Sequence, residues 1–141
     1  MALDNIFGIA GTALNAQLTR MNLTASNLAN QGTVNTTEAE AFRAKRPVFK
    51  AILSHEMATP GAQYIGGVKV DQIVDTINPP PKKYDPSSPL ADEKGYVYMS
   101  NVNEVTEMVE MMASARAYQN NVEVVNTARR LIMRTLEITK A

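Results

Sequence analysis

The amino-acid sequence predicts an α+β protein in which long N- and C-terminal helices pack as an antiparallel coiled-coil-like pair, with a small β-rich middle region between them. Apolar residues recur every three or four positions near both ends of the chain, which is the spacing of a helical seam. In the middle, residues rich in Val, Ile, Phe and Tyr alternate with polar ones, which predicts strands over 42–53, 67–77 and 95–99. Pro and Gly interrupt only this middle part in clusters, as expected for turns.

These patterns divide the chain into four segments. We expect an N-terminal helix over 1–31, a polar connector over 32–41, a β-rich region over 42–99 and a C-terminal helix over 100–141. The β-rich region contains a Pro-rich linker at 79–89, because consecutive prolines cannot donate the hydrogen bonds of a ladder.

The first helix is predicted from an unbroken stripe that steps by four and three residues. We expect Asp4 to cap its start and Gly32 to stop it. Between Met1 and Thr37 the only charged side chains are Asp4 and Arg20, whereas a helix exposed to water usually has a charged face. This helix is therefore expected to be covered on several sides. Its predicted packing residues are Phe7, Gly11, Leu14, Leu18, Met21, Ala25 and Leu28.

The second helix is predicted to begin near Asn101, with Glu104 completing a capping box. Its acidic residues come early and its basic residues late, which complements the helix dipole. A second apolar line beside the first gives it more apolar surface than one partner helix covers. The methionines at its start are interpreted either as core filling or as a surface that adapts to different neighbours. The predicted packing residues are Met108, Met111, Met112, Ala115, Val122, Val125, Leu131, Ile132 and Leu136.

Composition excludes several classes of function. The 141 residues carry 14 basic and 14 acidic side chains, so no general positive field exists to bind nucleic acid or an anionic membrane. The sequence has no Cys and a single His, which excludes disulfides and thiolate metal sites. We find neither a secretory signal nor an apolar run long enough for direct membrane insertion, so the default expectation is a cytosolic protein or one exported by another route.

Isolated chemical groups do not combine into a site. His55 beside Glu56 has no spaced nucleophile and is interpreted as a surface residue. Asp71 and Asp75 fit no calcium loop and are expected on a solvated strand face, as are Asp85 and Asp92. The glycines at 61, 66 and 67 are turn glycines, and the basic cluster Arg43, Lys45 and Arg46 is expected to form salt bridges between subunits. We therefore predict no catalytic, cofactor-binding or metal site, and no cofactor.

The ends of the chain carry motifs that resemble the bacterial flagellar basal-body rod and hook proteins. After the first stripe comes Ser26-Asn27-Leu28-Ala29-Asn30. The C-terminal half contains Asn101-Val102-Asn103 and then Arg116, Tyr118 and Gln119 within Arg-Ala-Tyr-Gln. With Phe42-Arg43-Ala44-Lys45 and Gly95-Tyr96-Val97-Tyr98 in the middle, the resemblance is greatest to the C-type proximal-rod subunits of that family. The sequence departs from the general family pattern at Asn35-Thr36-Thr37-Glu38, where Gly-Tyr would follow.

The resemblance implies a structural subunit that polymerises helically into the hollow rod of the basal body, which transmits torque and passes export substrates. It also implies export through the flagellar type III apparatus without a cleaved signal, a periplasmic location, and contact with itself, other rod subunits and the membrane-ring or export-gate adaptor at the base of the rod. The residues alone leave two alternatives open. One is a cytosolic coiled-coil adaptor or chaperone-like module, and the other is an enzyme with a polar pocket near His55.

Overall fold

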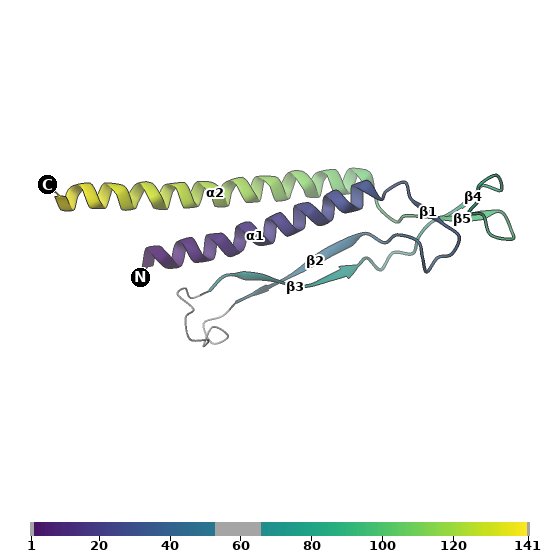
Figure 1. The fold of residues 1–141 in the computed structure, drawn as a ribbon, viewed down its shortest axis with the longest axis horizontal. Helices are drawn as coiled ribbons and strands as arrows, with labels where there is room; N and C mark the ends of the chain where they lie inside the picture. Colours follow the sequence, from purple (N-terminus) through teal and green to yellow (C-terminus); the bar gives the residue numbers. More distant parts are fainter. Residues whose placement is uncertain (1, 53–65, 141) are drawn as a thin grey trace. The chain divides into compact units, whose positions relative to one another are not determined.

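The computed structural model describes residues 2–52 and 66–140, and its secondary structure confirms the predicted α+β class (Figure 1). Two long helices, α1 and α2, lie at the two ends of the sequence, and short antiparallel strands lie between them in sequence. His55, Glu56 and Gly61, with the end of the strand predicted over 42–53, fall outside the described residues.

Helix α1 spans Ala2–Ala29. It begins two residues before Asp4, so the prediction that Asp4 is the N-cap is wrong. At the other end, the Asn30 side-chain amide donates to the Ser26 carbonyl at 2.8 Å and satisfies one of the last helical acceptors. Gly32 is not among the described glycines with positive φ, so the helix ends through this amide and not through the left-handed glycine that the sequence predicted.

Helix α2 spans Glu104–Lys140. Its N-cap is Asn103, whose side-chain oxygen accepts from the Thr106 backbone N–H at 3.0 Å. The predicted cap at Asn101 is therefore two residues too early, because the Asn101 side chain bonds elsewhere and leaves the capping to Asn103. Glu104 and Glu107 lie in the first turn, where the helix dipole favours negative charge.

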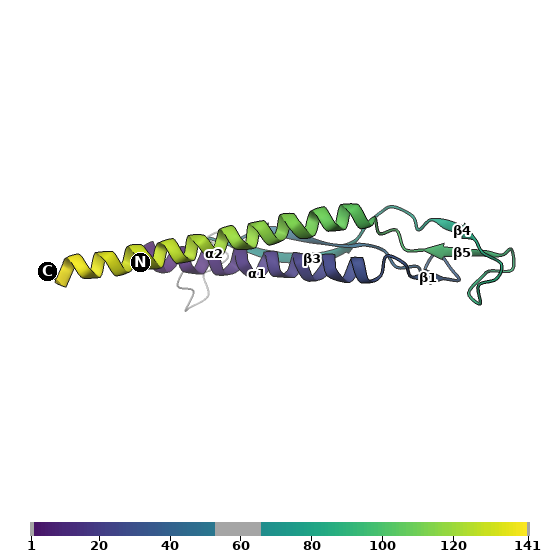
Figure 2. The same ribbon diagram turned by 90° about the horizontal axis from the view of Figure 1, so that it is seen from above.

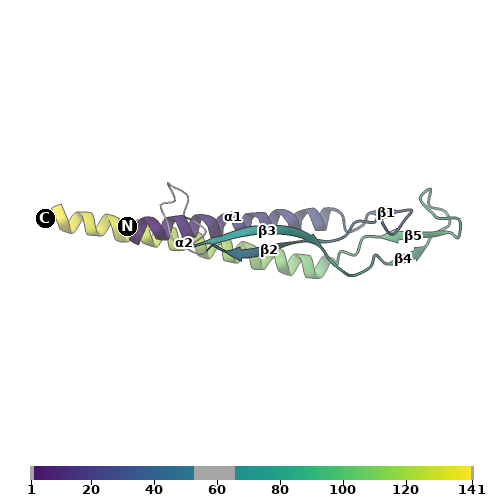
Figure 3. The same ribbon diagram turned by 90° about the horizontal axis from the view of Figure 1, so that it is seen from below.

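Strands β2 (Lys45–Ala51) and β3 (Val68–Asp75) form a two-stranded sheet, seen most clearly in Figure 3. The Ile52 N–H donates to the Gly67 carbonyl beyond one end of the ladder, and the Thr76 N–H donates to the Ala44 carbonyl beyond the other, both at 2.9 Å. These pairings are those of antiparallel strands. Both strands fall within the ranges predicted from the two-residue alternation.

A three-stranded antiparallel sheet has the order β1-β5-β4, with β1 at Val34–Asn35, β4 at Lys82–Tyr84 and β5 at Tyr96–Met99. Only β5 is predicted from the sequence. Strand β1 lies in the expected polar connector, and β4 lies in the expected Pro-rich linker directly after the last of three prolines. Both are short strands at the edges of the sheet, where few residues need to follow the period-two pattern.

Gly95 allows β4 and β5 to approach closely. Its φ is +79°, and a Cβ at this position would lie 2.9 Å from Cε2 of Tyr84. Only glycine adopts this conformation without strain, and no side chain would fit against the tyrosine ring. The ring itself meets Tyr96 edge to face, with centroids 5.2 Å apart.

The chain divides into two compact units. Unit 1 comprises Met1–Thr19, Val48–Gln72 and Ala113–Ala141, and unit 2 comprises Arg20–Pro47 and Ile73–Met112. Each unit thus contains a part of α1, a part of α2 and a part of the β2–β3 sheet. Within unit 2 the end of α1 lies beside the start of α2, as the two perpendicular views show (Figures 1 and 2).

Candidate functional site

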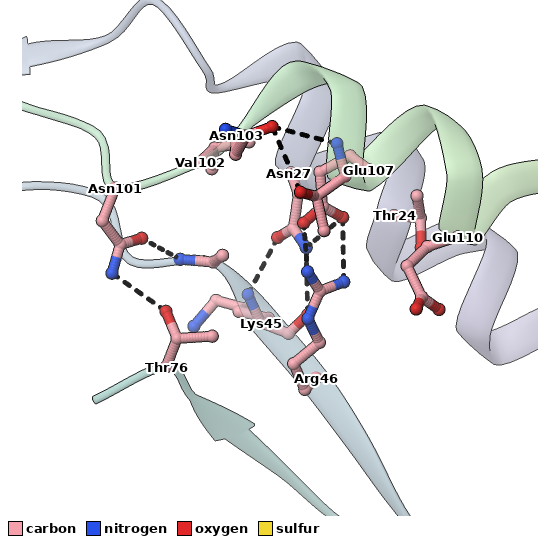
Figure 4. A network of polar contacts seen from close by, with 12 residues as sticks. Thr24, Asn27, Lys45, Arg46, Thr76, Asn101, Val102, Asn103, Glu107 and Glu110 are labelled. Carbon is pink, nitrogen blue, oxygen red and sulfur yellow. Dashed lines mark hydrogen bonds and ion pairs between the residues drawn. The ribbon is translucent and has the colours of Figure 1, made fainter. Parts of the chain in front are cut away.

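The largest group of connected polar side chains lies in unit 2, around Asn27 in the last turn of α1 (Figure 4). Its side-chain oxygen accepts from the Lys45 backbone N–H at 2.9 Å, and its amide nitrogen donates to the Lys45 carbonyl at 3.0 Å. Asn27 therefore pairs with the start of β2 as a neighbouring strand would. The side chain is fully buried, so both bonds form away from water, where an unmade bond would be costly.

Glu107 on the first turn of α2 joins the same network. The Asn27 amide nitrogen donates to its carboxylate at 3.1 Å, and Arg46 on β2 donates to both carboxylate oxygens, in one case at 3.0 Å. Glu107 is only 1% exposed, whereas the Arg46 side chain is about one-third exposed. Burying a carboxylate is tolerated when a two-pronged guanidinium and a further donor replace its water.

Further polar contacts tie the same region together. Arg20 on α1 forms an ion pair with Glu110 on α2, one turn along from Glu107. Between Arg20 and Asn27, the buried Thr24 hydroxyl donates to the Arg20 carbonyl at 3.0 Å. Its hydrogen bond is therefore formed within α1. The contact line between the two helix segments of unit 2 is therefore polar.

Asn101, just before α2, holds the segments that flank the β2–β3 sheet. Its side-chain oxygen accepts from the Ala44 N–H at 2.7 Å, and its amide nitrogen donates to the Thr76 hydroxyl at 2.9 Å and to the Asn78 carbonyl at 2.6 Å (Figure 4). The motif residues Asn27, Asn101 and Asn103 thus each use a side-chain amide to fix backbone: the start of a strand, the ends of the sheet and the first turn of a helix.

The basic cluster forms its ion pairs within the chain. Arg43 pairs with Glu38 at 3.5 Å, Lys45 with Asp75 at 2.9 Å, and Arg46 with Glu107. These ion pairs lie within the chain, and the expected pairing between subunits stays a prediction. The acidic partners come from three different segments, which no local sequence pattern connects to β2.

The most buried line on each helix is displaced by one residue from the predicted apolar stripe. In unit 2 the buried residues are Thr24, Asn27 and Glu107, and their stripe neighbours Ala25 and Met108 are exposed. Along both helices, the predicted packing residues that remain exposed are Gly11, Leu18, Ala25, Met108, Met112, Leu131 and Leu136. Those that are half-buried are Phe7, Leu14, Met21, Leu28, Met111, Ala115, Val122, Val125 and Ile132.

In unit 1 the buried side chains of the described residues are small, namely Ala10, Ala16, Ser114 and Ala128. Apolar side chains beside them reach solvent and line a groove of about 400 Å³ between the first turns of α1 and the second half of α2. The groove is lined by Ile6, Asn120, Glu123, Val124, Thr127, Ala128 and Leu131. The other motif residues contribute little to burial: Arg116 and Gln119 are exposed, and Tyr118 is half-buried.

The tip of the three-stranded sheet holds the described groups whose titration is shifted. The backbone N–H of Tyr96 bonds the Asp92 carboxylate at 2.9 Å and lowers the pKa of Asp92 below the ordinary 3.8. Contact with Tyr98 raises the pKa of Lys82, whose Nζ lies 5.1 Å from the ring centroid. Both groups are at the surface, and these shifts describe a well-made turn and a cross-strand pair.

The described residues contain no group of three or more His, Asp or Glu side chains placed to share a metal ion. No helix within residues 2–52 and 66–140 combines the length and apolar content that crossing a membrane requires. The polar network is thus built from groups that already bond one another and the backbone. The fold and contacts define a protein of two long helices, in which polar groups position the helices and apolar surface remains uncovered.

Sequence comparisons identify the family. Residues 93–138 match the family model described as flagellar basal body rod FlgEFG protein C-terminal. The chain is 48% identical over 138 residues to the flagellar basal-body rod protein FlgC of Escherichia coli O157:H7, and 46% identical over 138 residues to that of Salmonella typhimurium, covering 98% of both chains in each case. It is 44% identical to FlgC of Buchnera aphidicola subsp. Acyrthosiphon pisum, covering 99% of this chain and 100% of the relative. The chain belongs to the FlgC family of flagellar basal-body rod proteins, as the motif resemblance indicated.

Proposed function

We propose that this chain is a structural subunit of the flagellar basal-body rod that polymerises helically into a hollow drive shaft. The observation that carries the proposal is the uncovered apolar surface on both helices. Val105, Met108, Val109 and Met112 lie three or four residues apart on one face of α2 and are all exposed in the isolated chain. Such a face in an isolated subunit is typical of a protein that other chains cover.

The groove in unit 1 supports the same proposal. Its lining is mostly apolar, and its walls come from the terminal parts of the two helices. Burial of apolar surface stabilises contact by roughly 25 cal/mol per Å², so many modest contacts of this kind would make a stiff shaft. A subunit whose contact surfaces differ between its ends forms head-to-tail contacts, which build a filament and not a closed dimer.

We extend the proposal to partners and location. The chain assembles in the periplasmic part of the basal body with copies of itself and other rod subunits, and it meets the membrane-ring or export-gate adaptor at the base of the rod. It travels there through the flagellar type III export apparatus without a cleaved signal. It performs no catalysis, and its polar network serves packing, because every network group described above bonds another group of the chain.

A charge introduced into the uncovered stripe tests this function. Leu18→Asp adds a carboxylate to an exposed apolar position of α1, and Asn22→Asp adds the same charge to an exposed polar position of the same helix. In a strain that lacks the native chain, we expect Leu18→Asp to abolish motility and to be missing from purified basal bodies, while Asn22→Asp supports both. Recovery of the unmodified chain only from cytosol would favour the adaptor alternative and would overturn the proposal.

A further inference from the structure

At the start of α2, the buried face carries a charged residue and the exposed face carries apolar ones. In unit 2, Glu107 is buried, while Met108 next to it is 52% exposed and Val105 is 71% exposed. Burying a Met or Val side chain stabilises a protein, whereas burying a carboxylate is unfavourable unless it is paired. Apolar burial alone therefore predicts the opposite face of this helix towards α1.

The sequence also contains apolar residues along which α2 and α1 could meet. Consecutive residues on a helix are about 100° apart, so a rotation of α2 by about 100° around its axis would exchange Glu107 for Met108 at the buried position. The matching apolar line on α1 is the predicted stripe, which includes Met21 and Leu28. A pair of helices meeting on these lines would be an ordinary apolar coiled-coil contact.

The polar network explains why the observed seam is chosen. Asn27 is held on the β2 backbone by two hydrogen bonds at Lys45, and this fixes the amide that donates to Glu107. Arg46 approaches from β2 and donates to both oxygens of the same carboxylate. Three donors from two different segments converge on Glu107, and a rotation of α2 would break all three contacts together.

We propose that the Asn27–Arg46–Glu107 network selects the face of α2 that is buried within the chain, and so keeps the apolar face of Val105, Met108, Val109 and Met112 uncovered. Buried polar groups elsewhere specify the register of helices at some cost in stability. Here the network sets the rotation of one helix. Only the consequence for assembly rests on the proposed function, since a subunit that covered this face itself could not offer it to another subunit.

Methionine oxidation of the purified full-length chain measures the rotation directly. Met108 and Met133 are similarly exposed, at 52% and 54%, so peroxide should oxidise them at similar rates in the unmodified chain, as peptide mass spectrometry can report. Arg46→Met leaves the Glu107 carboxylate buried without its cation, which drives it into solvent and brings Met108 into the seam. We expect the Met108-to-Met133 rate ratio to fall by about threefold or more, as protection by burial requires.

Two further variants make the test specific. Adding Glu107→Leu to Arg46→Met places an apolar residue on the original line, and the ratio should return to that of the unmodified chain. Arg130→Met, which removes an exposed ion pair with Glu123 on the same helix, should leave the ratio unchanged. If circular dichroism shows that Arg46→Met does not fold, Arg46→Gln replaces it, and the expected fall is about twofold because a neutral donor remains.

An unchanged ratio in the folded Arg46 variant would overturn the inference, as would a fall that Glu107→Leu fails to reverse. Motility separates this outcome from failure of the proposed function. We expect Arg46→Met cells to lose motility and the double variant to regain it. If the oxidation ratios follow the prediction but the unmodified chain is absent from basal bodies, the inference that the network sets the rotation of α2 is supported and the proposed rod function is contradicted.

Discussion

The two compact units of this chain bury different kinds of side chain. Unit 2 buries Thr24, Asn27 and Glu107 on its helices and bonds them to each other or to the backbone of α1 and β2. Unit 1 buries alanines and a serine, and leaves larger apolar residues such as Val124 and Leu131 exposed around a groove. Unit 2 combines specific polar contacts with one uncovered apolar face, at Val105, Met108, Val109 and Met112, whereas the uncovered apolar surface of unit 1 surrounds the groove.

This difference indicates a division of roles along the same two helices. Directional hydrogen bonds fix helix positions with little apolar burial, so they suit the unit that sets the geometry of the subunit. Exposed apolar side chains stabilise the protein only when another chain covers them, so the groove of unit 1 and the apolar face of unit 2 suit contact with other subunits. Each prediction below changes one unit. It compares the effect on the free energy of unfolding of the free chain with the effect on assembly.

Glu107→Ala should have the largest effect on the folded chain. It leaves the Arg46 guanidinium in a largely enclosed site without its partner and removes a fully buried side chain. We expect the free energy of unfolding to fall by about 2–3 kcal/mol, discounted from the range for fully buried pairs because Arg46 reaches solvent. Urea unfolding followed by circular dichroism measures this. The matched change Glu123→Ala, in an exposed pair, should cost less than about 0.5 kcal/mol; equal losses would contradict the account.

Asn101→Ala should have the next largest effect. It removes three hydrogen bonds, and the Ala44 N–H, at a buried residue, loses its acceptor. We expect a loss of about 1.5 kcal/mol, together with faster amide exchange at Thr76 and Ala44. Exchange that accelerates equally in every helix would show global destabilisation and would argue against a local role in holding the sheet.

Asn103→Ala removes the N-cap of α2 and should cost about 1 kcal/mol. Asn103→Ser supplies another capping oxygen and is expected to recover most of the loss. If serine and alanine destabilise equally in thermal unfolding, the side chain does not act as a cap.

Leu131→Asp should have the smallest effect on the free chain and yet prevent assembly. Leu131 is exposed at the groove of unit 1, so an added carboxylate there stays hydrated and changes the free energy of unfolding by less than about 0.5 kcal/mol. Covered by another subunit, the same charge would be buried without a partner. Motility should be lost with Leu131→Asp and kept with Asn126→Asp. Full motility with Leu131→Asp would show that the groove is not an assembly surface.

The sequence predicts the helices and the longer strands well because their signals are local. Periodicity identifies α1 and α2 to within a few residues, and alternation finds β2, β3 and β5. It does not find β1 or β4, since strands of two or three residues pair through backbone groups that any sequence provides. The caps Asp4 and Gly32 are predicted from residue type alone, but α1 begins before Asp4 and Gly32 does not adopt a positive φ.

The candidate site is only partly predictable for a different reason. The motif includes Asn27 and Asn101, but their partners, such as Glu107 and Thr76, come from distant parts of the sequence. Glu107 is interpreted from sequence as a residue that interacts with the helix dipole, although it is buried. A signal does exist, because Glu107, Ser114 and Ala128 lie at heptad spacing one residue before the apolar stripe. Polar or small residues at that spacing do not indicate a contact line between helices unless the apolar stripe has another role, such as contact with other subunits.

Hydrogen exchange of the free, unmodified chain tests the division between the units most directly. Peptides that cover Thr24–Ala29 and residues 107–112 should exchange at least about tenfold more slowly than peptides that cover 124–138, which corresponds to about 1.4 kcal/mol. This result would show that the polar network keeps unit 2 folded in the isolated subunit, while the terminal part of α2 in unit 1 becomes stably folded only on assembly. Equal protection along α2, or stronger protection at 124–138, would contradict the account.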